Sequence, residues 1–351
     1  MIGLIGSLCN DRESASGQAV RTTFLYNALC KRYGTDNIFC LNTHNLKRNK
    51  AKMIYETVRC VLKCDQIIVM VHENGRKVYF PILAFAKKIL KRHVYHNVIG
   101  GSFAEYLKTN PKLIKPTQSF DVNWVQMASQ IKKLEDLKVT NNELLPNTKD
   151  VNIVSPNELS NYEGTTFRFC TLSRISKAKG IETAIHAIED VNKKHGREIV
   201  TLDIYGNPDS EYKVIFEELM KHVSGAVRYK GFVENTKTVE TLRGYYMLLF
   251  PSTYEGEGFP GTAWDAFAAG VPIIATNWKY NAEVIADGYT GLIYDYQSPD
   301  VLAKLIDYSI SHQTLINAMR INCVREIAQY TPDKVFPIIF KYFDPLYLKK
   351  A

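Results

Sequence analysis

The sequence predicts an α/β protein made of two doubly wound domains that face each other across a cleft. Short apolar runs alternate with amphipathic helical patterns nearly throughout, as is typical of βαβ units with parallel sheets. The chain has 351 residues, more than most single domains. Around Leu145, Pro146 and Asn147 the alternation stops, and a polar, turn-rich stretch follows, which indicates a linker between domains.

We therefore place the first domain at residues 1–150 and the second at residues 151–332. A helix at about 333–351 is expected to pack back on the first domain. The helix expected at 18–31 places Val20, Phe24, Leu25, Ala28 and Leu29 on one stripe, so it should pack on the first strand. The strands expected in the first domain are 2–5, 38–41, 66–71, 94–98 and 120–122.

The second domain repeats the pattern, with each apolar run followed by a helical pattern or a loop that contains glycine. Ligands of such domains bind at the carboxyl ends of the parallel strands. The strands expected here are 167–172, 200–205, 227–229, 247–250, 271–275 and 292–294.

The composition is that of a globular protein, with 46% hydrophobic and 23% charged residues and no repeat or low-complexity tract. These features argue against disordered, fibrous and solenoid classes. The net charge of +8 fits an acidic ligand, an anionic membrane or nucleic acid equally well. Two basic clusters are either solvated faces or contacts with an anionic membrane or acceptor: Lys47, Arg48, Lys50 and Lys52, and Lys87, Lys88, Lys91 and Arg92.

The seven cysteines are scattered without the spacing of metal ligands, so we interpret them as free thiols. Cys60 and Cys64 have the spacing of a buried helix face. The first six residues lack the features of a signal peptide, and no run approaches the roughly 20 apolar residues of a spanning helix. We expect a cytoplasmic protein that is at most peripheral at the inner face of the plasma membrane.

Residues 250–272 read as strand, glycine-rich loop, helix, glycine stop and strand. The loop Gly258, Phe259, Pro260 and Gly261 can bring backbone N–H groups at a helix start close to phosphate oxygens. Because the helix dipole supplies only about 0.3–1 kcal/mol, a diphosphate would also need cationic side chains.

Arg174 and Lys179 provide such cations between a strand and the helix that ends near residue 194. Arginine offers forked donors and lysine a compact charge, and together they suit a diphosphate. Taken alone, this segment is equally typical of a βα loop with solvated basic residues.

Together, the two segments resemble the C-terminal domain of retaining glycosyltransferase family 4, of the glycosyl transferases group 1. This large family has two Rossmann-like domains, the GT-B fold, and contains many bacterial capsule and lipopolysaccharide enzymes. The specific motif is the pair of acids Glu257 and Asp265, with seven residues between them that include Gly-Phe-Pro-Gly. The resemblance covers most of the chain, with support from Ser16-Gly17, His96, Arg174 with Lys179, and residues 145–147, 202–206 and 229–233.

The resemblance implies that Glu257 contacts the hydroxyls of a donor sugar and that residues 258–261 lie near the sugar and diphosphate. Asp265 stands where the family usually has glutamate, which binds the ribose hydroxyls. This shorter side chain is a departure that would keep a charge-assisted hydrogen bond but shift the ribose or require a water. Arg174 and Lys179 would hold the diphosphate and stabilise the leaving group in place of a metal. The sequence has no Asp-x-Asp, and we expect no metal or cofactor beyond the nucleotide-sugar donor.

Five further positions carry roles from the resemblance. Gly17 stands where the family often has two glycines close to the donor phosphates, and His96 where a histidine faces the donor sugar. A lone histidine is also often structural. Gly206, Phe232 and Val233 resemble the loops around the nucleotide base, although a turn glycine and core apolar residues would give the same pattern.

The function implied is sugar transfer with retention of configuration, from a nucleotide-sugar, by default a UDP-sugar, to a glycan or lipid-linked oligosaccharide. The expected setting is capsular, O-antigen or exopolysaccharide synthesis, with peripheral contact to an anionic membrane and no nucleic-acid partner. An oxidoreductase would need Gly-x-Gly-x-x-Gly after the first strand, which residues 3–9 do not supply. A catalytically silent GT-B binding or scaffolding protein remains an alternative because of Asp265.

Overall fold

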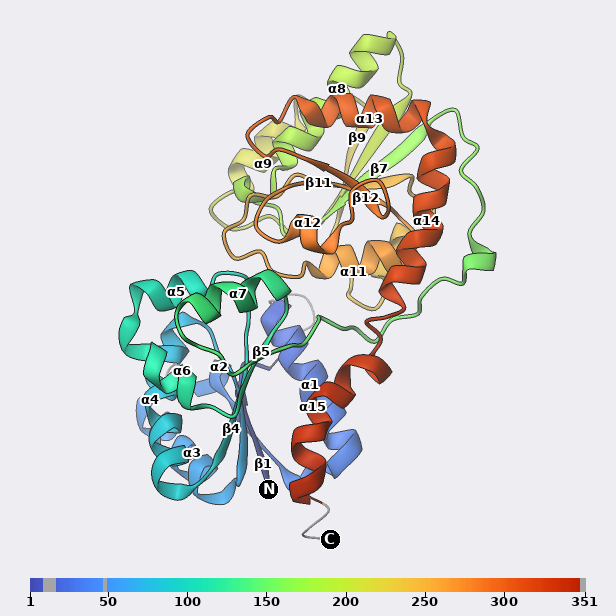
Figure 1. Ribbon diagram of the computed structural model, residues 1–351. Coiled ribbons are helices and arrows are strands. Elements are labelled where there is room, and N and C mark those ends of the chain that lie inside the picture. The colour runs from blue at the N-terminus through green and yellow to red at the C-terminus, as the bar shows by residue number, and fades with distance from the viewer. Residues whose placement is uncertain (9–16, 47–48, 348–351) are drawn as a thin grey trace. The chain divides into compact units, whose positions relative to one another are not determined.

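The computed structural model describes residues 1–8, 17–46 and 49–347 of the chain (Figure 1). The chain divides into two compact units, residues 1–147 with 332–351, and residues 148–331. Each unit contains a six-stranded sheet, and every strand pair in both sheets is parallel. The predicted fold of two parallel-sheet α/β domains is therefore confirmed.

The sheet of the first unit has the order β2-β1-β3-β4-β5-β6. The fifth predicted strand, at 120–122, begins later than expected, because Phe120 caps the preceding helix. The sequence analysis missed β6, whose Asn142 and Glu143 give no apolar signal at this edge of the sheet. The strands are β1 Ile2–Gly6, β2 Ile38–Asn42, β3 Gln66–Met70, β4 His93–Asn97, β5 Val122–Val125 and β6 Asn142–Leu144.

Helices cover both faces of this sheet. Figure 1 shows α3, α4 and α6 on one face and α1 with α15 on the other, as right-handed crossovers require for this strand order. The helices are α1 Gly17–Tyr33, α2 Thr43–Leu46, α3 Lys50–Lys63, α4 Glu73–Leu90, α5 Phe103–Thr109, α6 Ile114–Ser119, α7 Ala128–Asp136 and α15 Pro332–Tyr347.

Helix α1 packs on β1 as predicted, because a Cβ added at Gly6 would lie 2.8 Å from the methyl group of Thr22. Leu25 and Leu29 of the predicted stripe are buried, but its other three residues are only half-buried. The reason is that α15 covers this side of the helix, where the rings of Phe24 and Phe336 lie 5.1 Å apart.

The sheet of the second unit has the order β12-β11-β10-β7-β8-β9. The chain proceeds from β7 toward one edge and from β10 toward the other, so the topological switch point lies between β7 and β10. All six predicted strands are present. They are β7 Phe167–Leu172, β8 Val200–Tyr205, β9 Val227–Gly231, β10 Met247–Phe250, β11 Ile273–Thr276 and β12 Gly291–Tyr294.

Two helix layers cover the second sheet, with α13 beside α8 and α14 against α11. Among the described residues of both units, no helix is long and apolar enough to cross a membrane. The six described cysteines, which leave out Cys9, are free thiols as predicted. The helices are α8 Ile181–His195, α9 Lys213–Met220, α10 Thr238–Leu242, α11 Gly261–Ala268, α12 Asn281–Val284, α13 Val301–Ser311 and α14 Gln313–Ile327.

Candidate functional site

The switch point of the second sheet brings together two loops that are far apart in the sequence. Strands β7 and β10 pair directly, so the loops that follow them leave the same edge of the sheet side by side. The backbone N–H of Thr253 donates a hydrogen bond of 2.8 Å to the carbonyl of Ala178 and ties the two loops. The loop after β7 carries Arg174 and Lys179, and the loop after β10 carries Glu257.

Lys179 and Glu257 form a buried ion pair at this point. The lysine Nζ lies 2.6 Å from Glu257 Oε2, and the two side chains are 10% and 9% exposed. Ser252, which the sequence analysis did not single out, donates its hydroxyl to the same oxygen at 2.8 Å. The ammonium also lies 4.8 Å from the ring centroid of Tyr254, a cation–π contact. A buried ion pair adds little net stability, so its presence at a switch point favours a functional use of both charges.

Two glycines allow these loops to approach closely. Gly180 has a φ of +69°, and a Cβ there would lie 2.3 Å from the carbonyl oxygen of Pro251. Gly206 directly follows β8 and was predicted to bind the nucleotide-sugar donor. It has a φ of +134°, and a Cβ there would lie 1.7 Å from the carbonyl oxygen of Ser173. Any side chain at either position would force the backbones apart. Both glycines are therefore needed to close the site.

Arg174 lies on the open side of the cluster. Its side chain is 54% exposed, and its Nε lies 3.4 Å from Asp209 Oδ1. Its guanidinium lies 5.7 Å from the ring centroid of Tyr254, the ring that also contacts Lys179. Tyr254 thus lies next to both predicted cations, and neither it nor Asp209 was identified from the sequence. A half-exposed guanidinium beside a buried ammonium can meet an anion from solvent.

The predicted Gly258–Gly261 loop leads into α11, whose first residue is Gly261 and whose N-cap is Pro260. Thr262 donates its hydroxyl to the carbonyl of Leu172 at 2.6 Å, which fixes the start of α11 against the end of β7. The half-buried Phe259 packs its ring 5.7 Å from that of Tyr330. The N–H groups of the first turn of α11 are therefore held at the switch point, where they can bind an anion.

Asp265 is enclosed in the domain instead of open to solvent. Its side chain is 4% exposed, and Oδ2 accepts a hydrogen bond of 2.6 Å from Nζ of Lys149. Burial raises the pKa of Asp265, while the charge of Lys149 and the hydroxyl of Thr238 lower it. Lys149 lies in the predicted linker and was missed by the sequence analysis, because no motif connects it with a residue more than a hundred positions away.

Substitution of Lys149 by methionine should test this pair through its effect on pH-dependent stability. The variant leaves a buried carboxylate without its cation. We expect its free energy of unfolding at neutral pH to be about 3–5 kcal/mol lower than that of the wild type. Without the ammonium, the folded-state pKa of Asp265 rises further above its unfolded value. The free energy of unfolding of the variant is then highest below the pKa that Asp265 has in the unfolded chain. It falls as the pH rises through the pKa of Asp265 in the folded chain. Urea unfolding at pH 4 and pH 7 measures this, and an equal deficit at both pH values would contradict it.

The residues predicted around a nucleotide base lie at the ends of β8 and β9. The N–H of Gly206 donates to the carbonyl of Gly231 at 2.9 Å, and the hydroxyl of Tyr229 donates to the carbonyl of Gly206 at 2.9 Å. Phe232 is 40% exposed, so its alternative interpretation as a core residue is wrong. Val233 is half-buried. The two side chains follow β9 directly and are accessible next to Gly206.

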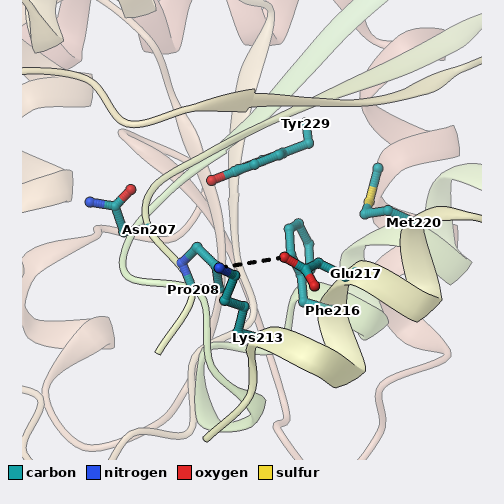
Figure 2. Close-up of a pocket in the computed structure, with 7 residues that line it drawn as sticks. All are labelled: Asn207, Pro208, Lys213, Phe216, Glu217, Met220 and Tyr229. Atoms are coloured by element: carbon teal, nitrogen blue, oxygen red, sulfur yellow. Dashed lines mark ion pairs between the residues drawn. The ribbon is translucent and has the colours of Figure 1, made fainter. Parts of the chain in front are cut away.

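A cavity of about 500 Å³ lies beside these residues, between the loop after β8, helix α9 and strand β9 (Figure 2). The rings of Tyr229 and Phe216 line it together, with their centroids 5.1 Å apart, and Lys213 lies 3.7 Å from Glu217 at its edge. None of the residues predicted to bind the nucleotide-sugar donor lines this cavity, and no sequence motif indicated it. The remaining lining residues are Asn207, Pro208 and Met220.

The first unit holds the other two predicted site residues. Gly17 begins α1 and is exposed, and a Cβ there would meet no atom within 4 Å; its neighbour Ser16 lies outside the described residues. His96 is fully buried in β4, with Nδ1 3.1 Å from Asn123 Oδ1 and its ring 4.8 Å from those of Phe80 and Phe103. Burial lowers the pKa of His96 well below its usual value, so the ring is neutral at pH 7. Its predicted contact with a donor sugar stays a prediction.

A comparison with protein families assigns the second unit. Residues 158–325 match the family described as glycosyl transferases group 1. These residues form a group 1 glycosyltransferase domain. The domain contains the Lys179–Glu257 pair, Arg174, Gly206 and the loop that leads into α11. This match confirms the predicted resemblance of the second domain to the glycosyl transferases group 1.

Two curated relatives match more of the chain than the second unit alone. An uncharacterized 41.2 kDa protein in the cps region of Klebsiella pneumoniae is 27% identical over 270 residues, or 76% of this chain. The match covers 64% of that relative, so the chain spans less than two thirds of its length. The 2-deoxystreptamine N-acetyl-D-glucosaminyltransferase of Niallia circulans is 22% identical over 292 residues, 76% of this chain and 74% of that protein.

Solved structures match the whole fold. HepE of Anabaena in complex with UDP has a TM-score of 0.78 at 15% identity, with 98% of this chain and 100% of that chain covered. The same protein in complex with UDP-glucose gives a TM-score of 0.74. Identity this low supports the fold alone, and the predicted GT-B fold is confirmed.

Proposed function

We propose that the protein transfers a sugar from a UDP-sugar to a glycan or lipid-linked acceptor, with retention of configuration and without a metal. The observation that carries the proposal is the buried Lys179–Glu257 pair at the switch point of a group 1 glycosyltransferase domain. Ligands of doubly wound domains bind at this edge of the sheet. Both charges are close enough there to act on one bound donor.

The donor sugar would lie against Glu257, whose carboxylate accepts hydrogen bonds from sugar hydroxyls. The diphosphate would meet Lys179, the half-exposed Arg174 and the N–H groups at the start of α11. Negative charge on the diphosphate grows as the glycosidic bond breaks, and fixed positive groups stabilise that change. The leaving diphosphate would assist attack of the acceptor hydroxyl on the same face of the sugar. UDP and UDP-glucose in HepE support a UDP-sugar as donor.

Gly206, Phe232 and Val233 are proposed to enclose the base, and Asp265 to serve the ribose. In the first unit, Gly17 and His96 are proposed to face the donor. The Klebsiella relative, from a cps region, supports a role in capsular or other surface-polysaccharide synthesis at the inner face of the plasma membrane. A catalytically silent binding protein is the second candidate, because Asp265 departs from the family pattern and is engaged by Lys149.

Thermal unfolding with a panel of nucleotides separates these possibilities. UDP at about 100 times its dissociation constant should stabilise the folded chain by about 2.7 kcal/mol. UDP-sugars should do the same, and equal concentrations of ADP or GDP should have smaller effects. If no nucleotide diphosphate shifts the transition, the donor assignment is lost. If UDP-sugars bind but neither transfer nor hydrolysis is detected with any acceptor, the silent alternative is correct.

The stereochemistry and metal requirement can be tested together on the active protein. Proton NMR of the product should show the same anomeric configuration as the donor. The rate should be unchanged by excess EDTA, because Arg174 and Lys179 supply the positive charge to the diphosphate. An inverted anomer would refute retention, and a rate lost to EDTA and restored by Mg²⁺ or Mn²⁺ would refute metal independence.

A further inference from the structure

Helix α4 carries two apolar stripes, although a surface helix usually has one. The inner stripe, which includes Phe80 and Leu83, is buried against the sheet. The outer stripe has a spacing of three or four residues, and its members are 38–63% exposed. No described residue of the unit covers this stripe. Its members are Val78, Ile82, Phe85 and Ile89.

Helix α3 repeats this arrangement on the same face of the sheet (Figure 1). Ile54, Val58 and Leu62 recur every four residues and are 51–62% exposed. The two helices are neighbours, because Cys60 and Val61 of α3 belong to the same buried hydrophobic cluster as Tyr79 and Phe80 of α4. The outer stripes of α3 and α4 thus lie on one side of the unit, and we call them the α3–α4 surface. Seven exposed apolar side chains on two neighbouring helices exceed the scattered single residues of an ordinary surface, and such a concentration marks an interaction site.

Basic side chains border the α3–α4 surface. Glu56 is the only acid in α3 and Glu73 the only one in α4; Glu56 is neutralised by Arg59 at 3.1 Å. The basic cluster predicted around residue 50 falls largely outside the described side chains, but the one at 87–92 lies at the end of α4. Four lysines around the surface are exposed: Lys52, Lys63, Lys77 and Lys88.

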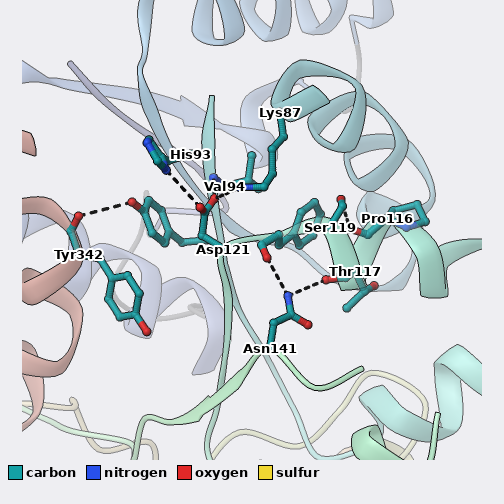
Figure 3. A network of polar contacts seen from close by, with 11 residues as sticks. Lys87, His93, Val94, Pro116, Thr117, Ser119, Asp121, Asn141 and Tyr342 are labelled. Carbon is teal, nitrogen blue, oxygen red and sulfur yellow. Dashed lines mark hydrogen bonds and ion pairs between the residues drawn. The ribbon is translucent and has the colours of Figure 1, made fainter. Parts of the chain in front are cut away.

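A basic groove of about 570 Å³ adjoins the outer stripe, between α4 and α6. Phe85 lines it together with Lys87, Lys88 and Lys115. Asp121 holds Lys87 at 2.6 Å (Figure 3), whereas Lys88 and Lys115 are exposed at the groove. The two ammonium groups can pair with lipid phosphates, and the exposed ring of Phe85 beside them can lie among the acyl chains.

We propose that the α3–α4 surface binds the surface of an anionic lipid bilayer, with its apolar stripes in the interface and Lys88 and Lys115 at lipid phosphates. Charge complementarity favours this occupant over a second copy of the chain. Two copies joined through this surface would bring their lysines together, whereas a bilayer offers phosphate next to hydrocarbon. None of the residues of this surface belongs to the proposed donor site, whose residues in this unit are Gly17 and His96.

Sedimentation of the full chain with vesicles tests the proposal. Vesicles of equal phosphatidylglycerol and phosphatidylcholine should bind the chain at least about tenfold more strongly than phosphatidylcholine alone, and less at high salt. Ile82→Asp/Phe85→Asp and Lys88→Glu/Lys115→Glu should each lower binding at least about tenfold. The matched control is Val214→Asp/Ile215→Asp on α9, where the replaced residues are 75% and 54% exposed; its binding should equal that of the wild type.

Vesicle binding that is unchanged in both surface variants, or equal for charged and neutral vesicles, would overturn the proposal. A dimer in solution that Ile82→Asp/Phe85→Asp dissolves would assign the surface to a second copy instead. All substituted residues are exposed, and thermal unfolding of each variant confirms that it folds. The shift produced by UDP in the same variants reports the donor site separately, so each proposal can fail without the other.

Discussion

Lys179→Ala is expected to lower the turnover number of sugar transfer on the order of 10² to 10³. The ammonium lies 2.6 Å from Glu257 and is 10% exposed. In so enclosed a place, solvent screens its charge less than at the surface. Three side chains from β10 and the loop after it hold the ammonium in place: Glu257, Tyr254 and Phe250. A positive charge already in position stabilises a leaving diphosphate without reorganisation.

The matched control is Lys177→Ala. Lys177 belongs to the same short helical turn as Lys179 but is exposed, so its loss should leave turnover near that of the wild type. Lys179→Ala also leaves the carboxylate of Glu257 buried with only Ser252 as its described partner, and we expect a lower melting temperature. Turnover must therefore be measured below the transition of the variant, at saturating donor. Wild-type turnover in a folded Lys179→Ala protein would remove this residue from the mechanism.

The strands were predictable because parallel strands buried on both faces leave continuous apolar runs. Residues 167–172, 200–205 and 247–250 were assigned with the observed bounds. The edge strand β6 was not, since pairing on one side only does not require apolar residues such as those of central strands. The buried side of α1 was predicted only in part, because the contact of Phe24 with Phe336 joins the two ends of the chain.

Lys179 and Glu257 were singled out from the family resemblance, and the topology of the sheet explains why they meet. Lys179 and Glu257 each follow a strand, and a doubly wound sheet places those two strands side by side at its switch point. Their neighbours were not predictable. Ser252 and Tyr254 belong to no motif, and the bond between Lys149 and Asp265 spans 116 positions. His96 illustrates a further limit, because a strand pattern does not reveal whether a histidine side chain is enclosed in the core, as this one is, or faces a ligand.

Glu257→Gln should impair sugar transfer more than nucleotide binding. Glutamine keeps the shape of the side chain but loses the negative charge that Lys179 contacts and that is proposed to bind the sugar hydroxyls. A charge-assisted hydrogen bond is worth about 1.5–3 kcal/mol, so turnover should fall by roughly 10- to 150-fold. The dissociation constant of UDP should change less, because UDP has no donor sugar. Steady-state rates with a UDP-sugar and calorimetry with UDP measure the two effects.

Glu255→Gln provides the control, since Glu255 belongs to the same loop but is 72% exposed and pairs with Lys279 at the surface. This variant should leave the turnover number and the dissociation constant of UDP unchanged. If Glu257→Gln instead weakened UDP binding more than turnover, Glu257 would contact the nucleotide, and the sugar would have to be recognised elsewhere. Asp265, held by Lys149 in the interior, would then no longer be needed at the ribose, and its shorter side chain would be explained by packing alone.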